Sequence, residues 1–141
     1  MQFSNTVTIH RNVSDVFAFL EHFENLPKWN YAIVETRKTS PGPVGVGTTY
    51  EQTRSLPHKA TEAFQVIAYE PDRKVAIEGD LGPLYGVLSY EVKRSDEGTQ
   101  LTNSAQLEGR GISGVVAELA RDRVRKAVLE NLEKLKALLE A

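Results

Sequence analysis

The chain has no cysteine among its 141 residues, and this absence excludes several kinds of site. Disulfides, thiolate nucleophiles and thiolate metal ligands all require that residue. No segment approaches the roughly 20 consecutive apolar residues of a membrane-spanning helix. The first residues, MQFSNTVTIHRN, also lack the apolar core of a signal peptide. We therefore expect a cytoplasmic protein with no membrane span.

Basic residues are not in surplus. Seventeen Lys and Arg stand against nineteen Asp and Glu, which gives a formal net charge of -2. Proteins that neutralise nucleic-acid phosphates normally carry a basic excess. The local basic cluster at 121–126 is interleaved with Glu118 and Asp122 at spacings that pair on a helix, so it predicts a solvated face. We expect no nucleic-acid partner.

Catalytic and metal-binding motifs are also missing. Three histidines occur, at positions 10, 22 and 58, without the spacing of a metal site. The chain has no H-E-x-x-H, phosphate-binding loop, G-x-S-x-G or dinucleotide fingerprint. The sequence therefore predicts no metal, no cofactor and no catalytic triad.

Short runs with a period of two fill most of the chain. Phe3, Val7 and Ile9 alternate with polar residues and predict a first strand. Six further strands are expected at 32–39, 47–56, 58–69, 73–79, 84–94 and 99–108. No helical period separates the last five, so we expect antiparallel connections rather than parallel crossovers.

Two helical patterns accompany these strands. Asn12 predicts an N-cap with Asp15 at N3, and the short helix that follows ends or bends at Pro27. From Ile112 to Ala141, with Ser113 as the expected cap, Leu and Val hold one face of a helix roughly 40 Å long. This order predicts one α+β domain, residues 1–141, in which the helices lie on one side of an antiparallel sheet.

Six segments carry a pattern that extends over the whole chain. They are VFAFL at 16–20, PKW at 27–29, Val34-Glu35, PVGVGT at 43–48, YEPDRK at 69–74 and GTQLT at 98–102. Together with the long terminal helix, they resemble the polyketide cyclase/dehydrase-like family of the START, or SRPBCC, superfamily. The resemblance implies the helix-grip fold, in which a curved seven-stranded antiparallel sheet wraps round a long C-terminal helix and two short helices follow the first strand.

The resemblance implies a cavity between the sheet and the helix. Some members of that family bind lipids, sterols, hormones or quinones, and others cyclise or dehydrate aromatic polyketides. We therefore expect a small hydrophobic or amphipathic ligand as the partner. The matching segments are turns, caps and core positions, so they specify the fold and do not choose among these functions.

Strand alternation predicts which side chains face that cavity. The inner face holds Asn103 beside Leu101, Ala105 and Leu107, Tyr90 beside Leu88 and Val92, Phe64 beside Glu62 and His58, and Tyr50 beside Gln52, Arg54 and Leu56. Tyr50, Tyr90 and Asn103 either satisfy groups of the protein itself or contact a ligand. Trp29 belongs either to the core, which we favour, or to the cavity entrance that the resemblance implies. The predicted ligand-binding residues are Trp29, Tyr50, Gln52, Arg54, Glu62, Phe64, Tyr90 and Asn103.

A register argument pairs Arg54 with Glu62. If Pro57, His58 and Lys59 form the turn, Arg54 lies opposite Glu62 and Gln52 lies opposite Phe64. The favoured interpretation is a structural ion pair near the hairpin end. The alternative is a polar anchor, since an arginine fork suits a ligand carboxylate.

Three functions remain open. The first is a non-catalytic binding module. The second is a cyclase or dehydratase that uses Tyr90, Tyr50 or Arg54 to polarise a carbonyl and Glu62 or His58 to accept a proton. The third is a protein-interaction role, such as a homodimer formed through the sheet edge or the charged helix face.

Overall fold

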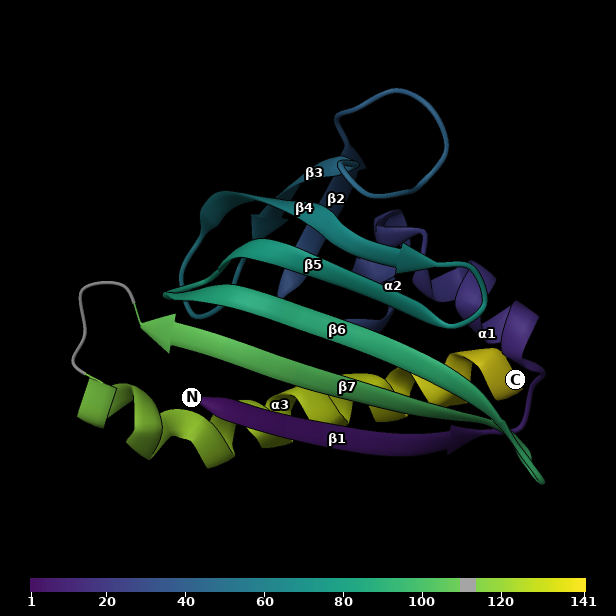
Figure 1. Cartoon of the computed structure of the whole chain (residues 1–141). Coiled ribbons are helices and arrows are strands. Elements are labelled where there is room, and N and C mark those ends of the chain that lie inside the picture. Colours follow the sequence, from purple (N-terminus) through teal and green to yellow (C-terminus); the bar gives the residue numbers. More distant parts are fainter. Residues whose placement is uncertain (110–113) are drawn as a thin grey trace.

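The computed structural model describes residues 1–109 and 114–141 and confirms the helix-grip arrangement (Figure 1). Its elements are β1 (Gln2–Ile9), α1 (Val13–Leu20), the 3-10 turn η1 (Phe23–Asn25), α2 (Leu26–Trp29), β2 (Ile33–Lys38), β3 (Thr49–Arg54), β4 (Ala60–Glu70), β5 (Lys74–Leu81), β6 (Leu84–Ser95), β7 (Gly98–Gly109) and α3 (Gly114–Glu140). The expected helix start at Ile112 and its cap Ser113 lie outside the described residues.

The seven strands form one sheet in the order β1-β7-β6-β5-β4-β3-β2, and every neighbouring pair is antiparallel. The strand at the start of the chain therefore pairs with the last strand. In Figure 1, α3 runs along β1 and β7, and the short helices lie beside its C-terminal turns. All helices thus cover the concave face of the sheet.

Two glycines allow neighbouring strands to approach closely where the sheet curves. Gly79 on β5 and Gly86 on β6 are register partners. A Cβ atom at Gly79 would lie 2.3 Å from the carbonyl oxygen of Ala63, and one at Gly86 would lie 2.0 Å from that of Gln106. Gly86 also has a φ of +155°, which side chains disfavour. Only glycine fits these two positions.

The first helix begins as predicted. The Asn12 side-chain oxygen accepts a hydrogen bond from the Asp15 amide at 2.9 Å, which satisfies one of the free N–H groups of the first turn. The helix ends at Leu20, and Pro27 stands in the first turn of α2, where its missing N–H is tolerated. The chain between them forms η1 and turns Phe23 towards the sheet.

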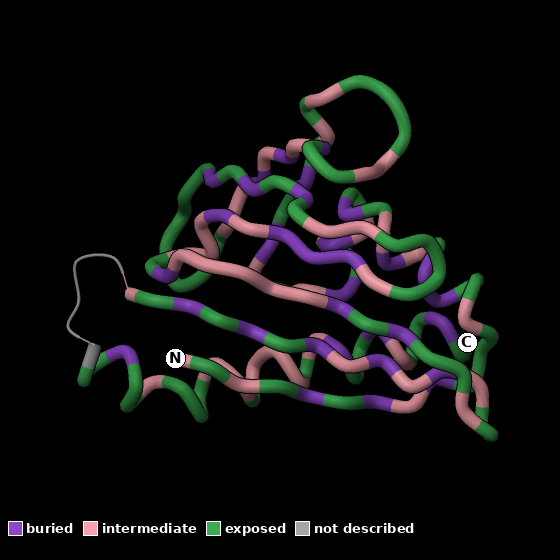
Figure 2. The backbone as a smooth tube through the Cα atoms, in the orientation of Figure 1, coloured by how far each residue is buried: buried purple, intermediate pink, exposed green. Residues whose placement is uncertain are grey.

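The two halves of α3 differ in how they are held. Leu132, Leu135 and Leu139 are buried in the core. At the same end, the His10 amide donates to Glu140 at 2.8 Å and the Arg11 guanidinium donates to the Leu139 carbonyl at 2.6 Å. Between residues 115 and 131, by contrast, only Ala117 is buried (Figure 2). No helix among the described residues is long and apolar enough to cross a membrane.

Candidate functional site

The structure places most of the predicted inner-face residues in the interior. Tyr50, Gln52, Phe64, Tyr90 and Asn103 are all buried, as the strand alternation predicted. They come from β3, β4, β6 and β7 and face the helices across the concave side of the sheet. The side-chain directions are confirmed, and the role of these residues in binding stays a prediction.

An aromatic cluster fills the part of the interior beneath the short helices. The ring of Phe23 lies 5.5 Å from that of Tyr50, 5.6 Å from Phe64 and 6.4 Å from Tyr90. Trp29 meets Tyr90 edge to face at 6.2 Å and is itself buried. Sequence analysis did not identify the central position of Phe23. The sequence signal for its burial was that this apolar residue continues the helical spacing of the preceding segment, shortly before Pro27.

A band of polar side chains crosses the inner face under α3. Asn5 on β1, Asn103 on β7 and Tyr90 on β6 are successive register partners. Asn5 donates to the Arg125 carbonyl of α3 at 3.1 Å. Sequence analysis missed Asn5, although a period of two puts it on the same face as Phe3 and Val7.

Asn103 is the least satisfied member of this band. Its side-chain nitrogen donates to the Ser89 carbonyl at 3.3 Å, while its Oδ1 atom is buried and accepts no hydrogen bond from any described residue. The residue has 0% exposure. A buried acceptor without a donor destabilises the folded protein. A water molecule or a ligand hydroxyl that donates a hydrogen bond to this atom would remove that cost.

Tyr50 carries the second orphaned group. Its hydroxyl is buried and makes no hydrogen bond of normal geometry with the described residues. Burial, and then the charge of Glu24, raise the pKa of Tyr50, while the backbone of Phe23 partly opposes this shift. Burial likewise raises the pKa of Tyr90. Both phenols are therefore neutral at physiological pH and could donate or accept a hydrogen bond.

The polar band separates two apolar clusters. The larger is the main core, which includes Val7, Leu101 and the buried leucines at the C-terminal end of α3. The smaller, which we call the second cluster, is built from Leu84, Ala105 and Leu107, with Met1, Phe3, Leu81, Leu88 and Val124 packed against it. It lies at the end of the sheet where β7 ends and α3 begins (Figure 1).

Glu62 is the centre of a polar network at that same end. Its Oε1 atom accepts from Gln52 at 2.7 Å and from the Arg54 Nε atom at 2.9 Å, and its Oε2 atom accepts from the Gly82 amide at 2.8 Å. The Arg54 and Glu62 side chains are only 12% and 4% exposed. The carboxylate therefore ties the β3–β4 hairpin to the β5–β6 turn.

The predicted register of this hairpin was wrong, although the predicted ion pair forms. Gln52 lies opposite Glu62 and Tyr50 lies opposite Phe64, because the turn spans residues 55–59 and is centred on Pro57 rather than on His58. Arg54 reaches Glu62 diagonally. A shift of two residues keeps every side chain on the same face of a strand, so the contact survives.

The turn residues themselves lie elsewhere than expected. Leu56 and His58 were placed on the inner face, but both follow the end of β3 and are exposed. A strand period cannot be extended into a turn, which is the physical reason for both errors. His58 therefore lies outside the interior. Among the described residues, no three His, Asp or Glu side chains are grouped to hold a metal ion.

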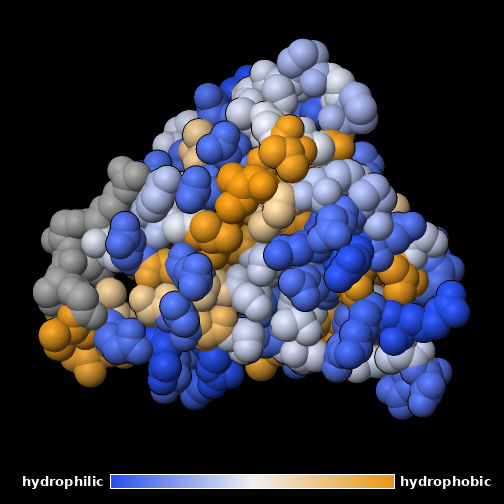
Figure 3. Space-filling view, in the orientation of Figure 1, coloured by the Kyte–Doolittle hydropathy of each residue, from blue (hydrophilic) through white to orange (hydrophobic). Residues whose placement is uncertain are grey.

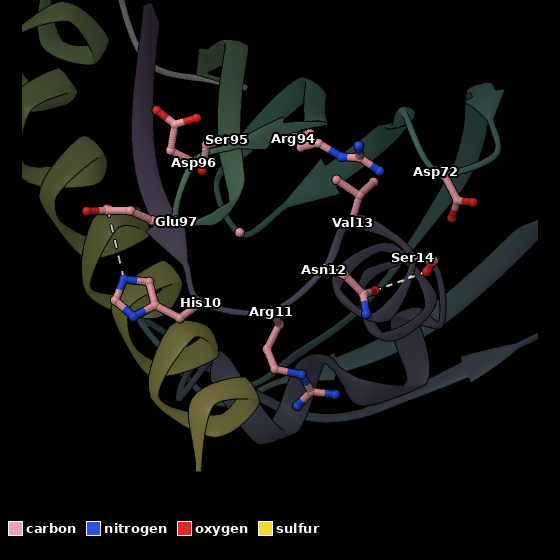
Figure 4. A pocket seen from close by; sticks show the side chains of 11 residues that line it. His10, Arg11, Asn12, Val13, Ser14, Asp72, Arg94, Ser95, Asp96 and Glu97 are labelled. Atoms are coloured by element: carbon pink, nitrogen blue, oxygen red, sulfur yellow. Dashed lines mark hydrogen bonds and ion pairs between the residues drawn. The ribbon is translucent and has the colours of Figure 1, made fainter.

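Surface hollows lie outside the space between the sheet and α3. One of about 660 Å³ is lined by residues 10–14, Asp72 and residues 94–98, at the end of the sheet opposite the second cluster. Figure 4 shows His10 directed at Glu97, 4.0 Å away, and Ser14 at Asn12. Its lining combines the basic Arg11 and Arg94 with the acidic Asp72, Asp96 and Glu97, so it selects neither an anion nor a cation. Hollows of about 590, 370 and 300 Å³ lie against the outer face of the sheet.

Comparison with known proteins finds one family model that matches nearly the whole chain. Residues 1–140 match the model of a family described as "Polyketide cyclase / dehydrase and lipid transport". No curated protein matches the chain.

Three solved structures illustrate the likeness in fold. The Zhui aromatase/cyclase from Streptomyces sp. R1128 is 12% identical, with a TM-score of 0.82 over 99% of this chain and 93% of that one. The di-domain ARO/CYC StfQ of the steffimycin pathway is 15% identical with a TM-score of 0.79, and this chain covers 99% of its own length and half of that protein. Ara h 8.0201 is 16% identical with a TM-score of 0.74 over 99% and 97% of the two chains. At such identities these likenesses establish the fold alone.

Proposed function

Because the chain belongs to the family described as "Polyketide cyclase / dehydrase and lipid transport", we propose that it binds a small apolar or amphipathic molecule between the sheet and α3. The ligand class is a lipid, a quinone or a polyketide-like compound. The proposal concerns binding, with no cofactor and no metal required for it.

The buried Oδ1 atom of Asn103 is the observation that carries this proposal. It lies at 0% exposure on the wall that faces α3, with no donor among the described residues. The Tyr50 hydroxyl on β3 is likewise buried and has no hydrogen-bond partner of normal geometry among the described residues. Ligand sites typically combine an apolar wall with a few such convergent polar groups. A hydroxyl or N–H group of the ligand would satisfy Asn103.

The apolar part of the ligand is proposed to lie against the second cluster. The main core contains a cluster of aromatic rings, whereas the α3 residue that packs on the second cluster, Val124, belongs to the half of that helix with few buried residues. The predicted residues take distinct roles here. Trp29, Phe64 and Tyr90 form the closed end, Tyr50 and Asn103 supply polar groups, and Gln52, Arg54 and Glu62 form the rim.

The test is native mass spectrometry of protein purified from cells, followed by thermal shifts with a panel of lipids, quinones and aromatic polyketides. We expect a retained ligand or a stabilising compound, and weaker binding of hydroxyl-bearing compounds by Asn103→Ala. Ser104→Ala, which changes the next residue on the outer face, is the matched control. Ligand-free protein and no shift with any compound would count against binding.

A cyclase or dehydratase reaction is the second candidate, favoured by the aromatase/cyclase names of two structural neighbours. Glu62 and His58 were the candidate bases. Glu62 already accepts hydrogen bonds on both oxygens, and His58 is exposed on a turn, so neither is poised to take a proton from a guest in the interior. Turnover of polyketide-like substrates that is lost in Tyr90→Phe and Glu62→Gln, measured where circular dichroism shows that both variants are folded, would establish this function instead. His58→Ala should leave such turnover unchanged.

A further inference from the structure

The first turns of α3 present aliphatic side chains to solvent. Val115, Val116 and Leu119 are 71%, 52% and 81% exposed, and we call them the aliphatic stripe. Leu119 stands two positions after the buried Ala117, which is about 200° round the helix, so it points away from the core. Figure 3 shows hydrophobic surface where α3 begins, at lower left. Three neighbouring exposed aliphatic residues on one helix suggest a surface that becomes covered.

Basic residues continue this stripe along the helix. Arg123 and Lys126 follow Leu119 by four and seven positions and so share its side of α3. Both are exposed, and neither forms an ion pair with a described residue.

The acidic residues of the same turns are already neutralised. Glu118 lies 3.7 Å from Arg121, and Asp122 lies 3.8 Å from Arg121 and 3.9 Å from Arg125. Glu130, four positions after Lys126, also lies on this side of the helix. Residues 118–130 therefore carry four basic side chains against three acidic ones, so this face is positive although the whole chain carries a formal charge of -2. Remote carboxylates contribute little, because salt screens exposed charges beyond about 8 Å under physiological conditions.

We propose that this face of α3 docks on a bilayer surface that contains anionic lipids. The aliphatic stripe would enter the headgroup region while Arg123 and Lys126 contact lipid phosphates. A second copy of the chain fits less well, because three aliphatic residues are far fewer than the roughly 20–30 residues a side of a stable dimer. This inference goes beyond ligand binding and does not depend on it.

Docking in this orientation would bring the second cluster close to the lipid. Val124 lies between the two basic positions in sequence and packs inward on that cluster. The same helix segment therefore presents one face to the membrane and the other to the proposed binding space.

Vesicle co-sedimentation of the full chain tests the proposal. The probes are phosphatidylcholine vesicles with and without phosphatidylglycerol, at low and physiological salt. We expect binding to the anionic vesicles that falls as salt rises. In Arg123→Gln/Lys126→Gln the affinity should fall about 30-fold, which corresponds to roughly 1 kcal/mol for each basic residue near an anionic surface.

Two further variants identify the surface. Replacing all three stripe residues by Ser should weaken binding to both kinds of vesicle. Lys93→Gln/Arg94→Gln removes the same charge from exposed positions on β6 and should change binding less than twofold. Unchanged melting temperatures would show that the variants fold.

The proposal is overturned if the wild type binds neither vesicle, if phosphatidylglycerol makes no difference, or if the β6 variant loses as much affinity as the α3 variant. It is also overturned if light scattering finds a dimer that the Ser variant dissociates, because the face would then belong to a second copy. No ligand is added, so failure here leaves ligand binding standing, and the reverse also holds.

Discussion

Removing the hydroxyl of Tyr50 should stabilise the ligand-free protein. Tyr50→Phe deletes one buried oxygen that has no hydrogen-bond partner of normal geometry. The ring contacts remain, because the ring of Phe64 stacks at 5.1 Å and that of Phe23 lies edge to face at 5.5 Å. The substitution therefore changes a polar group and very little packing.

The size of the effect follows from the cost of burying an unpaired polar group. That cost is about 1–3 kcal/mol, and replacing the hydroxyl by hydrogen recovers most of it. In a domain of this length, 1 kcal/mol corresponds to a rise of about 3–5 °C in melting temperature. If the hydroxyl contacts the ligand, the same variant should also bind more weakly.

Urea unfolding of ligand-free protein measures the change directly, with the m-value as a check on two-state behaviour. Tyr69→Phe is the matched control and should lower the free energy of unfolding, since the Tyr69 hydroxyl donates to Glu21 at 2.8 Å. Because the acceptor is a carboxylate, its loss should cost about 1.5–3 kcal/mol. If Tyr50→Phe is destabilised as much as Tyr69→Phe, the Tyr50 hydroxyl has a partner in solution, and the argument for a ligand group there is refuted.

Three more predictions concern the polar network, the helix end and α3. Glu62→Gln leaves the Arg54 charge largely buried and should lower the free energy of unfolding by about 3 kcal/mol in urea titrations; a loss under 1 kcal/mol would contradict a structural role. The His10 amide, and then Lys136, lower the pKa of Glu140. Its contribution is therefore fully present above its ordinary pKa of 4.5 and lost as the pH falls through the lowered pKa of the folded state, so Glu140→Gln should lower the melting temperature at pH 7 and lower it progressively less as the pH falls below 4.5. Leu135→Ala should cost about 3 kcal/mol and Leu119→Ala less than about 0.5 kcal/mol, because only the first side chain is buried; equal losses would contradict the description of α3.

Local rules predicted the fold well because each element carries its own signal. The Asn12 cap, the period of two in the strands and the long apolar face of the last helix all depend on neighbours within a few residues. The antiparallel order followed from short connections. The family resemblance then supplied the curvature, which no single strand encodes.

The site was less predictable because it depends on distances between elements. Phe23 lies in a 3-10 turn, and only the assembled structure shows its ring between Tyr50, Phe64 and Tyr90. Whether Asn103 finds a donor likewise depends on strands far apart in the sequence. Strand alternation predicted the direction of these side chains. Their contacts could be identified only from the packed structure.

The uneven packing of α3 reconciles a filled core with the proposed binding of a guest. Moving the C-terminal half outward would expose Leu132, Leu135 and Leu139, at about 1.5–3 kcal/mol for each buried side chain, and would break the bonds to His10 and Arg11. Moving the first half would break one bond, from Asn5 to Arg125, and would uncover Ala117, part of Val124 and the second cluster, which a bound apolar ligand would cover again. The segment that opens at least cost is therefore the one that covers the second cluster. The same segment also carries the aliphatic stripe. One short stretch of helix is therefore both the part of α3 that a ligand could displace most easily and the part best suited to contact a lipid bilayer.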